Sequence, residues 1–151
     1  MPWRIRRGMS RAAVDTSFAI ALMDEKDRHH ERALRILDGI EKAGLEVIYI
    51  DCVINEIYSV IARRFAERKM SERFPEMADK ITFSLEDVEI INAYRYLPKA
   101  HPQVVELMKR TEGRLSYHDA LMALSLKEEG VGKIISLDVD FDEVRWLERI
   151  G

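Results

Sequence analysis

The sequence predicts an α/β domain with a mainly parallel sheet. Short apolar segments with the composition of strands alternate along the chain with longer segments whose apolar residues recur at helical spacing. This alternation is typical of helices that connect neighbouring parallel strands. The 151 residues, 47% of them hydrophobic, suffice for one core, and no Gly/Ser-rich or Pro-rich linker divides them. We therefore expect one domain over residues 1–151, with residues 1–11 as a basic N-terminal extension.

The first third of the chain predicts two strands with two helices between them. Residues 12–14 form a short apolar run with strand character, and residues 18–23 predict a short helix. From Asp27 onward the apolar residues follow helical spacing, and Gly44 has the residue type that commonly ends a helix. Residues 47–50 predict the second strand.

The rest of the chain continues the alternation. Apolar residues between Ile54 and Phe65 follow the three-and-four spacing of an amphipathic helix. Ser116 is suited to begin a helix as its N-cap, and Gly130 is suited to follow its end. The remaining predicted elements are a charged helical segment over 70–82, a third strand over 88–91, a short helix over 102–110, a helix over 117–129 and a last strand over 134–137.

Composition excludes several classes of protein. Cys52 is the only cysteine, so the chain can form neither an intrachain disulfide nor a cysteine-built zinc site. No apolar run approaches the roughly 20 residues that cross a membrane as a helix, and the basic start lacks a signal-like apolar stretch, so we expect a cytoplasmic protein. The net charge of −3 argues against a typical basic nucleic-acid binder, although acids buried in a site would add to this total without facing a substrate.

Four acidic residues occupy the points where predicted strands give way to helices or turns. They are Asp15, Glu56, Asp119 and Asp138. Because the same ends of parallel strands meet at one edge of a sheet, we expect these residues to converge. Four carboxylates in one pocket require protonation or a hard cation, and Mg²⁺ or Mn²⁺ is the natural choice. The chemistry that such ions support is attack on a phosphodiester.

Each acid also has a purely structural explanation. Asp15 could cap the following helix, Asp119 could form a capping box with Ser116, Glu56 could be a solvated residue near a helix start, and Asp138 could open a turn. Taken singly, these explanations are favoured. The joint pattern favours a metal, because burying an unpaired carboxylate on apolar helices costs several kcal/mol and a cation offsets that cost.

Three segments carrying these acids resemble the PIN domain family, the nuclease fold common in VapC-type toxins. The segment VDTSFAIALMDEKDRHHERA is similar to the family's opening, with Asp27, His30 and Ala33 at the spacing of its D-x-x-H-x-x-A helix start. The segment NEIYSVIARR resembles the helix that carries a metal-binding Glu. The segment SYHDALMALSLKEEGVGKIISLDVDF resembles an S-x-x-D-A helix, a strand and a Ser/Thr-x-Asp-x-Asp-Phe turn. The resemblance spans about residues 12–145, but residues 66–115 match only in helical character.

The resemblance implies a three-layer α/β/α fold and a metal-dependent endoribonuclease, the toxin of a toxin–antitoxin pair. Its metal ligands would be Asp15, Glu56, Asp119 and Asp138, with Asp140 as a less certain fifth. Thr16, Ser17 and Ser136 would hydrogen-bond the ligands or a metal-bound water. Implied partners are RNA, an antitoxin protein and a second copy of the chain. Two alternatives remain open: an RNA-processing PIN nuclease without an antitoxin, and a catalytically silent PIN-like domain that binds RNA or protein.

The other motifs in the sequence give weaker evidence of function. Asp138-x-Asp140-x-Asp142 begins like an EF-hand loop but lacks the required Gly and final Glu. The histidines at positions 29 and 30 could be metal ligands, although a packing or capping role is favoured for His30, and His118 is expected to point from a different helix face than Asp119. Two basic groups are expected to be mainly solvated, with a subset that guides RNA, namely Arg63, Arg64, Arg68, Lys69 and Arg73, and Lys109, Arg110 and Arg114.

Two expectations concern surfaces. Tyr58, Phe65 and Met70 are candidates for an exposed apolar patch at a twofold dimer interface. An antitoxin tail is expected to run along a groove beside the acids, lined by apolar side chains around Phe18 and Ile57, and to insert a basic residue.

Overall fold

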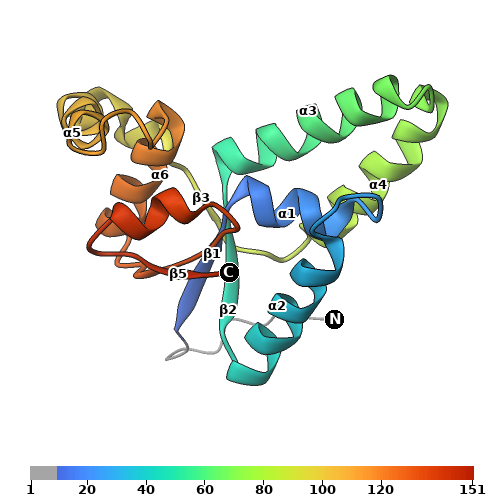
Figure 1. Cartoon of the computed structure of the whole chain (residues 1–151), viewed down its shortest axis with the longest axis horizontal. Coiled ribbons are helices and arrows are strands. Elements are labelled where there is room, and N and C mark those ends of the chain that lie inside the picture. The colour runs from blue at the N-terminus through green and yellow to red at the C-terminus, as the bar shows by residue number, and fades with distance from the viewer. Residues whose placement is uncertain (1–9) are drawn as a thin grey trace.

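The computed structural model describes residues 10–151 and has five parallel strands in the order β3-β2-β1-β4-β5 (Figure 1). The strands are β1 Arg11–Val14, β2 Glu46–Ile50, β3 Ile90–Ile91, β4 Lys133–Ile135 and β5 Glu148–Ile150. The helices are α1 Thr16–Met23, α2 His30–Ala43, α3 Asp51–Glu67, α4 Phe74–Ser84, α5 Leu97–Arg110 and α6 Tyr117–Glu128. Three short 3₁₀ helices are Ser71–Arg73, Tyr94–Tyr96 and Val139–Glu143. The predicted α/β/α fold with a parallel sheet is confirmed.

Strand β1 is the centre of the sheet. Its last three residues, Ala12, Ala13 and Val14, have no exposed surface. Ala13 lies opposite Ile48 on one side and Ile134 on the other. Small and β-branched side chains suit a strand that is covered on both faces, since the helices can then approach closely. The carboxyl end of β1 therefore delivers Asp15 to the middle of the sheet edge.

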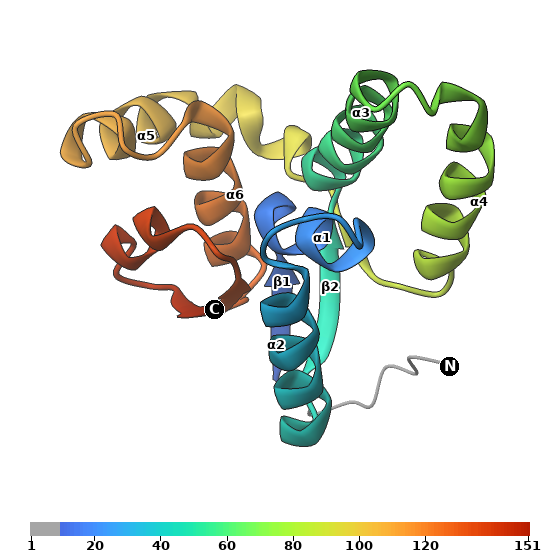
Figure 2. The same ribbon diagram turned by 45° about the vertical axis from the view of Figure 1, so that its right-hand side comes forward.

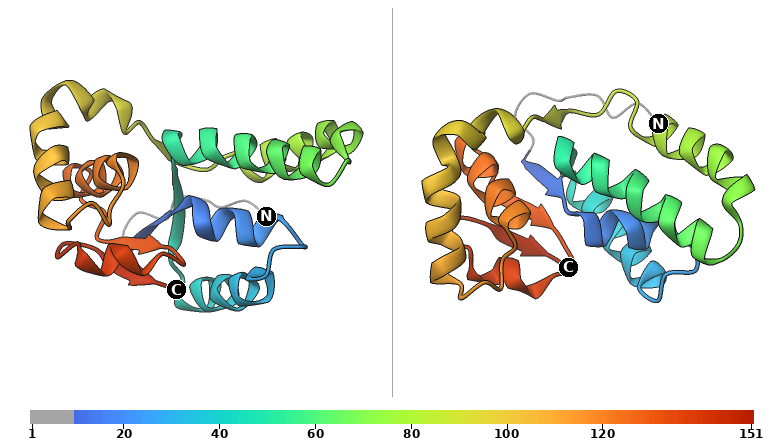
Figure 3. Two further views of the ribbon diagram at one scale, coloured as in Figure 1. Left: turned by 45° about the horizontal axis from the view of Figure 1, so that its top comes forward. Right: turned by 90° about the horizontal axis from the view of Figure 1, so that it is seen from above.

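The helices gather in two groups around this centre. Helix α1 packs against both α2 and α3, as the left view of Figure 3 shows. Helices α5 and α6 pack on each other and lie on one side of the molecule, while α3 and α4 lie on the other (Figures 1 and 2). Among the described residues, none of the helices is long and apolar enough to cross a membrane.

Several bounds differ from the sequence prediction: α3 begins at Asp51, α4 is Phe74–Ser84, β3 is Ile90–Ile91 and β4 is Lys133–Ile135. The largest differences concern α5 and β5. Helix α5 begins at Leu97 and not at Pro102, because Pro98 takes the first-turn position that suits proline and Pro102 is accommodated inside the helix. Strand β5 was not predicted. Its three residues pair with β4 in parallel. Glu148 and Lys133 lie opposite each other in this pairing, and Glu148 Oε2 forms a 2.6 Å ion pair with Lys133 Nζ.

The start of the chain is described only in part. Residues 1–9 of the expected basic extension lie outside the described residues. Arg11, which was assigned to that extension, instead begins β1 and forms a 2.8 Å ion pair with Glu89.

Candidate functional site

Asp15 lies directly after β1 and is held by two hydroxyl groups. Ser17 Oγ donates to Asp15 Oδ2 over 2.8 Å. Ser136 is the residue after β4, and its Oγ donates to the same oxygen over 2.6 Å. The two hydroxyls are themselves positioned by the backbone N–H groups of residues 137 and 138, which donate to them over 3.1 and 3.0 Å. Asp15 is only 5% exposed. A buried carboxylate at the sheet edge is thus oriented by residues from two neighbouring strand ends.

Asp119 lies in the first turn of α6 and forms the capping box that was considered as its structural explanation. Its backbone N–H donates to Ser116 Oγ over 3.1 Å, and its Oδ2 accepts from the Ser116 N–H over 3.3 Å. Within the described residues the Ser116 N–H is the one hydrogen-bond donor to the Asp119 side chain, and it uses Oδ2. Capping therefore occupies one carboxylate oxygen and does not exclude a second role for the other.

Electrostatics show that the acids are neighbours. Burial raises the pKa of Asp15, the hydroxyl donors oppose this, and the charge of Asp119 raises the pKa further. Burial likewise raises the pKa of Asp119, and the charges of Asp138 and Glu56 add to the increase. Asp119 therefore repels each of the other three. Asp119 thus lies within electrostatic range of Asp15, Glu56 and Asp138, although the four acids come from α3, α6 and the ends of β1 and β4.

Glu56 projects from the second turn of α3 and meets His118. His118 Nδ1 lies 3.1 Å from Glu56 Oε1, and His118 Nε2 lies 3.4 Å from the hydroxyl of Tyr94. His118 points from a different face of α6 than Asp119, as expected, but that face is directed at Glu56. Tyr94 was missed entirely, because its place beside His118 depends on the packing of α6 against the segment after β3.

Asp138 and Asp140 share the 3₁₀ turn after β4. Asp138 Oδ1 accepts from the Asp140 N–H over 2.9 Å, so Asp138 also has the turn-forming role that was considered for it. Thr16 begins α1 and, with Ser17, Asp138 and Arg28, lines a hollow of about 350 Å³ beside the acids. Of the four acids, Asp138 is the one that lines this hollow.

Asp51 is an acid at a strand end that sequence reasoning passed over. Its Oδ1 accepts from the N–H of Cys52 over 2.8 Å and from the N–H of Ala93 over 3.0 Å. It thereby ties the start of α3 to the segment after β3. The cue was available, since Asp51 follows β2 as Asp15 follows β1.

The donor set suits a hard divalent cation. All four acids offer carboxylate oxygens, the ligands that Mg²⁺ and Mn²⁺ prefer, and a cation would remove the repulsion that raises the pKa of Asp119. Across residues 10–151, no three His, Cys, Asp or Glu side chains already lie in the arrangement that a bound ion requires. An ion would therefore have to draw the carboxylates inward.

Arg64 and Arg68, which were expected to be mainly solvated, are instead partly buried and paired with acids. Arg64 Nη1 lies 2.6 Å from Asp24 and 2.7 Å from Asp27, and Arg68 binds both oxygens of Asp24 over 2.9 and 2.8 Å. These pairs tie the end of α3 to the loop between α1 and α2. Arg64 and Arg68 are therefore occupied by protein carboxylates and are poor candidates for guiding RNA. His30 has the expected packing role, with Nδ1 2.8 Å from the carbonyl oxygen of Ala21.

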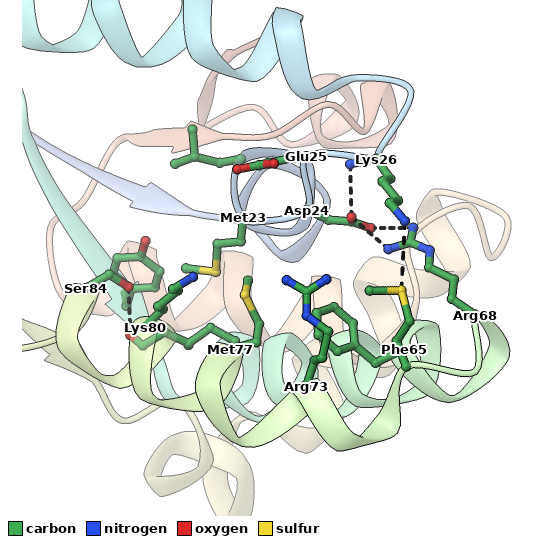
Figure 4. A pocket seen from close by; sticks show the side chains of 14 residues that line it. Met23, Asp24, Glu25, Lys26, Phe65, Arg68, Arg73, Met77, Lys80 and Ser84 are labelled. Atoms are coloured by element: carbon green, nitrogen blue, oxygen red, sulfur yellow. Dashed lines mark hydrogen bonds and ion pairs between the residues drawn. The ribbon is translucent and has the colours of Figure 1, made fainter.

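The structure has two hollows with apolar lining. Phe18 and Ile57 are 2% and 0% exposed and line neither, but their neighbours Ile20 and Val60 line the hollow of about 350 Å³ beside Asp138. A second hollow of about 440 Å³ lies between α1, α3 and α4. Figure 4 shows Met23 and Met77 directed into it from α1 and α4, with Arg68 bound to Asp24 at its edge.

The predicted exposed patch is also wrong. Tyr58 donates to or accepts from the Thr82 hydroxyl over 2.7 Å, and Phe65 packs edge-on against Phe74 with ring centroids 6.4 Å apart. Both rings are half-buried between α3 and α4, and Met70 lines the hollow of Figure 4. These apolar side chains are used to pack α4 onto α3, which sequence periodicity alone does not reveal.

Comparison with known proteins identifies related sequences and folds. A model of the PIN domain family matches residues 12–147. The toxin VapC20 of Mycobacterium tuberculosis, described as cleaving the sarcin–ricin loop, superposes with a TM-score of 0.67 at 22% identity, covering 92% of this chain and 98% of that one. VapBC2 of Rickettsia felis, solved with a DNA fragment from its promoter, gives a TM-score of 0.65 at 13% identity, covering 92% and 96%. At these identities the likeness concerns the fold. No curated protein matches the chain in sequence.

Proposed function

The chain belongs to the PIN domain family, and from this membership and the acidic site we propose that it is a metal-dependent endoribonuclease. One observation carries the proposal. A buried Asp15 and a capping Asp119 are placed where they repel each other, and Asp119 also repels Glu56 and Asp138. A fold maintains such repulsion only against a cost in stability, and a site for a divalent cation explains that cost.

The residues of the site have distinct roles in this proposal. Asp15, Glu56, Asp119 and Asp138 would hold Mg²⁺ or Mn²⁺, which when bound supplies an activated water and stabilises charge on a phosphodiester. Ser17 and Ser136 fix the orientation of Asp15 through their 2.8 and 2.6 Å hydrogen bonds. No side chain acts as a covalent nucleophile. We further propose that Asp140 assists by orienting a water or a ligand, and that Thr16 assists at the edge of the hollow.

Purified protein tests the activity. We expect it to cleave single-stranded RNA with Mn²⁺ or Mg²⁺ and to stop when EDTA is added. Asp119→Asn should abolish cleavage, because the amide lacks the charge that holds a cation. Asp79→Asn, which changes an exposed acid on α4, is the matched control and should retain full activity. Cleavage that persists in EDTA, or in Asp119→Asn, would overturn the mechanism.

We propose further that the nuclease is the toxin of a toxin–antitoxin pair and acts in the cytoplasm. The support is the fold, which it shares with the toxin VapC20 and with a chain of VapBC2. The antitoxin would insert a basic residue among the acids, where an arginine can pair with two carboxylates. Overproduction of the chain alone should arrest growth, and both Asp15→Ala and co-expression of a neighbouring gene should relieve the arrest. Absence of arrest from soluble protein would favour the RNA-processing alternative.

The hollow between α1, α3 and α4 is the proposed docking groove for this partner. Its floor is apolar, with Met23, Phe65 and Met77, while Arg73 and Lys80 lie at its edge (Figure 4). Such a groove suits an amphipathic helix with acidic flanks. Met77→Asp should weaken binding of the antitoxin without loss of RNA cleavage. Phe83→Asp, the same kind of change at a 73% exposed position on α4, should not. Equal binding by both variants would refute this placement.

A further inference from the structure

Three residues from separate parts of the fold form a hydrogen-bonded row beside the acidic site. Glu56 comes from α3, His118 from the first turn of α6, and Tyr94 from the 3₁₀ turn after β3. His118 contacts Glu56 through Nδ1 over 3.1 Å and Tyr94 through Nε2 over 3.4 Å. The rings of Tyr94 and His118 also meet edge to face, with centroids 6.1 Å apart and planes inclined by 64°. The imidazole is thus held on both sides.

The chemistry of the three groups sets the direction of both hydrogen bonds. A carboxylate can only accept, so His118 Nδ1 must carry the proton and donate to Glu56. In the neutral ring the other nitrogen is then an acceptor, and the hydroxyl of Tyr94 is its donor. Donation therefore runs from Tyr94 through His118 to Glu56, with no conflict at any atom.

Glu56 is the acid of the site that most needs such a partner. The carboxylate of Asp15 is held by two serine hydroxyls, that of Asp119 by the Ser116 N–H, and that of Asp138 by the Asp140 N–H. Each of these donors is local to its acid or comes from the neighbouring strand end. Glu56 has a longer side chain that is 36% exposed, and within residues 10–151 His118 supplies its hydrogen bond. Without that donor the side chain would sample several rotamers in solvent.

We propose that His118 is a positioning residue for Glu56 and that Tyr94 fixes the ring of His118. This inference rests on the proposed metal-dependent function, in which Glu56 is a ligand. In that role His118 does for Glu56 what Ser17 and Ser136 do for Asp15, by limiting the number of orientations that the carboxylate samples before an ion binds. Loss of an outer hydrogen-bond partner of this kind typically weakens metal binding about 10- to 100-fold.

Binding of Mn²⁺ to the full-length protein, measured by calorimetry in the absence of RNA, is the test. We expect His118→Ala to raise the Kd for Mn²⁺ about 10- to 100-fold. His118→Asn should restore binding, because its amide N–H occupies the place of Nδ1–H. His118→Gln should not, since its amide extends to the place of Nε2. Tyr94→Phe should lower affinity less than His118→Ala, because the aromatic contact remains.

His101→Ala is the matched control. His101 Nδ1 lies 2.7 Å from the hydroxyl of Tyr117, so this variant removes a second His–Tyr pair that does not contact an acid of the site. It should bind Mn²⁺ like the wild type. Wild-type affinity in His118→Ala, or equal affinity in His118→Asn and His118→Gln, would overturn the positioning role while leaving the proposed function intact. Failure of the wild type to bind Mn²⁺ at all would instead overturn the proposed function and this inference with it. If His118→Ala does not fold, the Asn and Gln variants alone decide.

Discussion

Replacing Asp24 by asparagine removes one charge from a buried ion-pair network and leaves the volume of the side chain unchanged. Asp24 lies at the end of α1 with its side chain 4% exposed. It accepts from Arg68 over 2.9 and 2.8 Å, from Arg64 over 2.6 Å, and from the N–H of Lys26 over 3.1 Å. The network joins the end of α3 to the loop that leads into α2. Loss of the network should therefore lower the free energy of unfolding of the whole domain.

The expected magnitude follows from the pKa of this carboxyl. Burial raises the pKa of Asp24, but the bonds from Arg68 and Arg64 outweigh burial and lower it from an ordinary 3.8 to about 2. At about 1.4 kcal/mol per pKa unit, this difference corresponds to roughly 2 kcal/mol at neutral pH. The two arginines are 29% and 27% exposed, so solvent screens the pairs only in part. Asparagine can still accept from Lys26. We therefore expect Asp24→Asn to lose about 2 kcal/mol of unfolding free energy at pH 7.

The pH dependence identifies the cause. Because the folded protein holds this carboxyl in its charged form, the stabilisation is complete above the ordinary pKa of 3.8 and disappears as the pH falls toward about 2. The difference between wild type and Asp24→Asn should thus be constant from pH 7 to pH 5 and shrink progressively below pH 4. Urea unfolding followed by circular dichroism at each pH measures it.

Asp38→Asn is the matched control for the Asp24 experiment. Asp38 forms a 2.6 Å pair with Lys42 on α2, but the two side chains are 59% and 75% exposed. Such surface pairs contribute little, so this variant should unfold like the wild type at every pH. A difference for Asp24→Asn below about 0.5 kcal/mol at pH 7, or one that does not change between pH 7 and pH 3, would refute the assignment of its stability to the ion pairs.

Three further outcomes are expected. In EDTA, Asp119→Asn should be more stable than the wild type, because burial and the charges of Asp138 and Glu56 raise the pKa of Asp119 in the folded state. The gain in stability should grow as the pH rises above the ordinary carboxyl pKa of 3.8. Thermal unfolding at pH 5 and pH 8 measures the gain, and a loss of stability at pH 8 would favour a purely capping role. Addition of Mn²⁺ should raise the unfolding midpoint of the wild type but not that of Asp119→Asn, since an ion stabilises only the state that binds it. Light scattering at micromolar concentration should give the mass of a twofold homodimer, the commonest soluble assembly, and a monomer mass would contradict this.

The local parts of the candidate site could be read from the sequence. The position of Asp15 after a short apolar strand, the capping pair of Ser116 and Asp119, and the turn at Asp138 all occur as predicted. Each depends on hydrogen bonds or hydrophobic patterns that act within a few residues of the chain. The parallel order of strands, which places Asp15 and Asp138 at one edge, follows from the alternation of strands and helices, whereas Glu56 and Asp119 come from α3 and α6 and not from strand ends.

Contacts between distant segments were decided only by the tertiary structure. The partner of Glu56 is His118, 62 positions later, and the partner of Asp24 is Arg64, 40 positions later. Phe65 was expected at the surface but packs edge-on against Phe74 and is half-buried. In each case the sequence specifies a helix and its polar and apolar faces, whereas the identity of the side chain opposite depends on where two helices cross. The packing of the whole core sets where the helices cross, so the crossing point cannot be predicted from apolar periodicity and local hydrogen bonds.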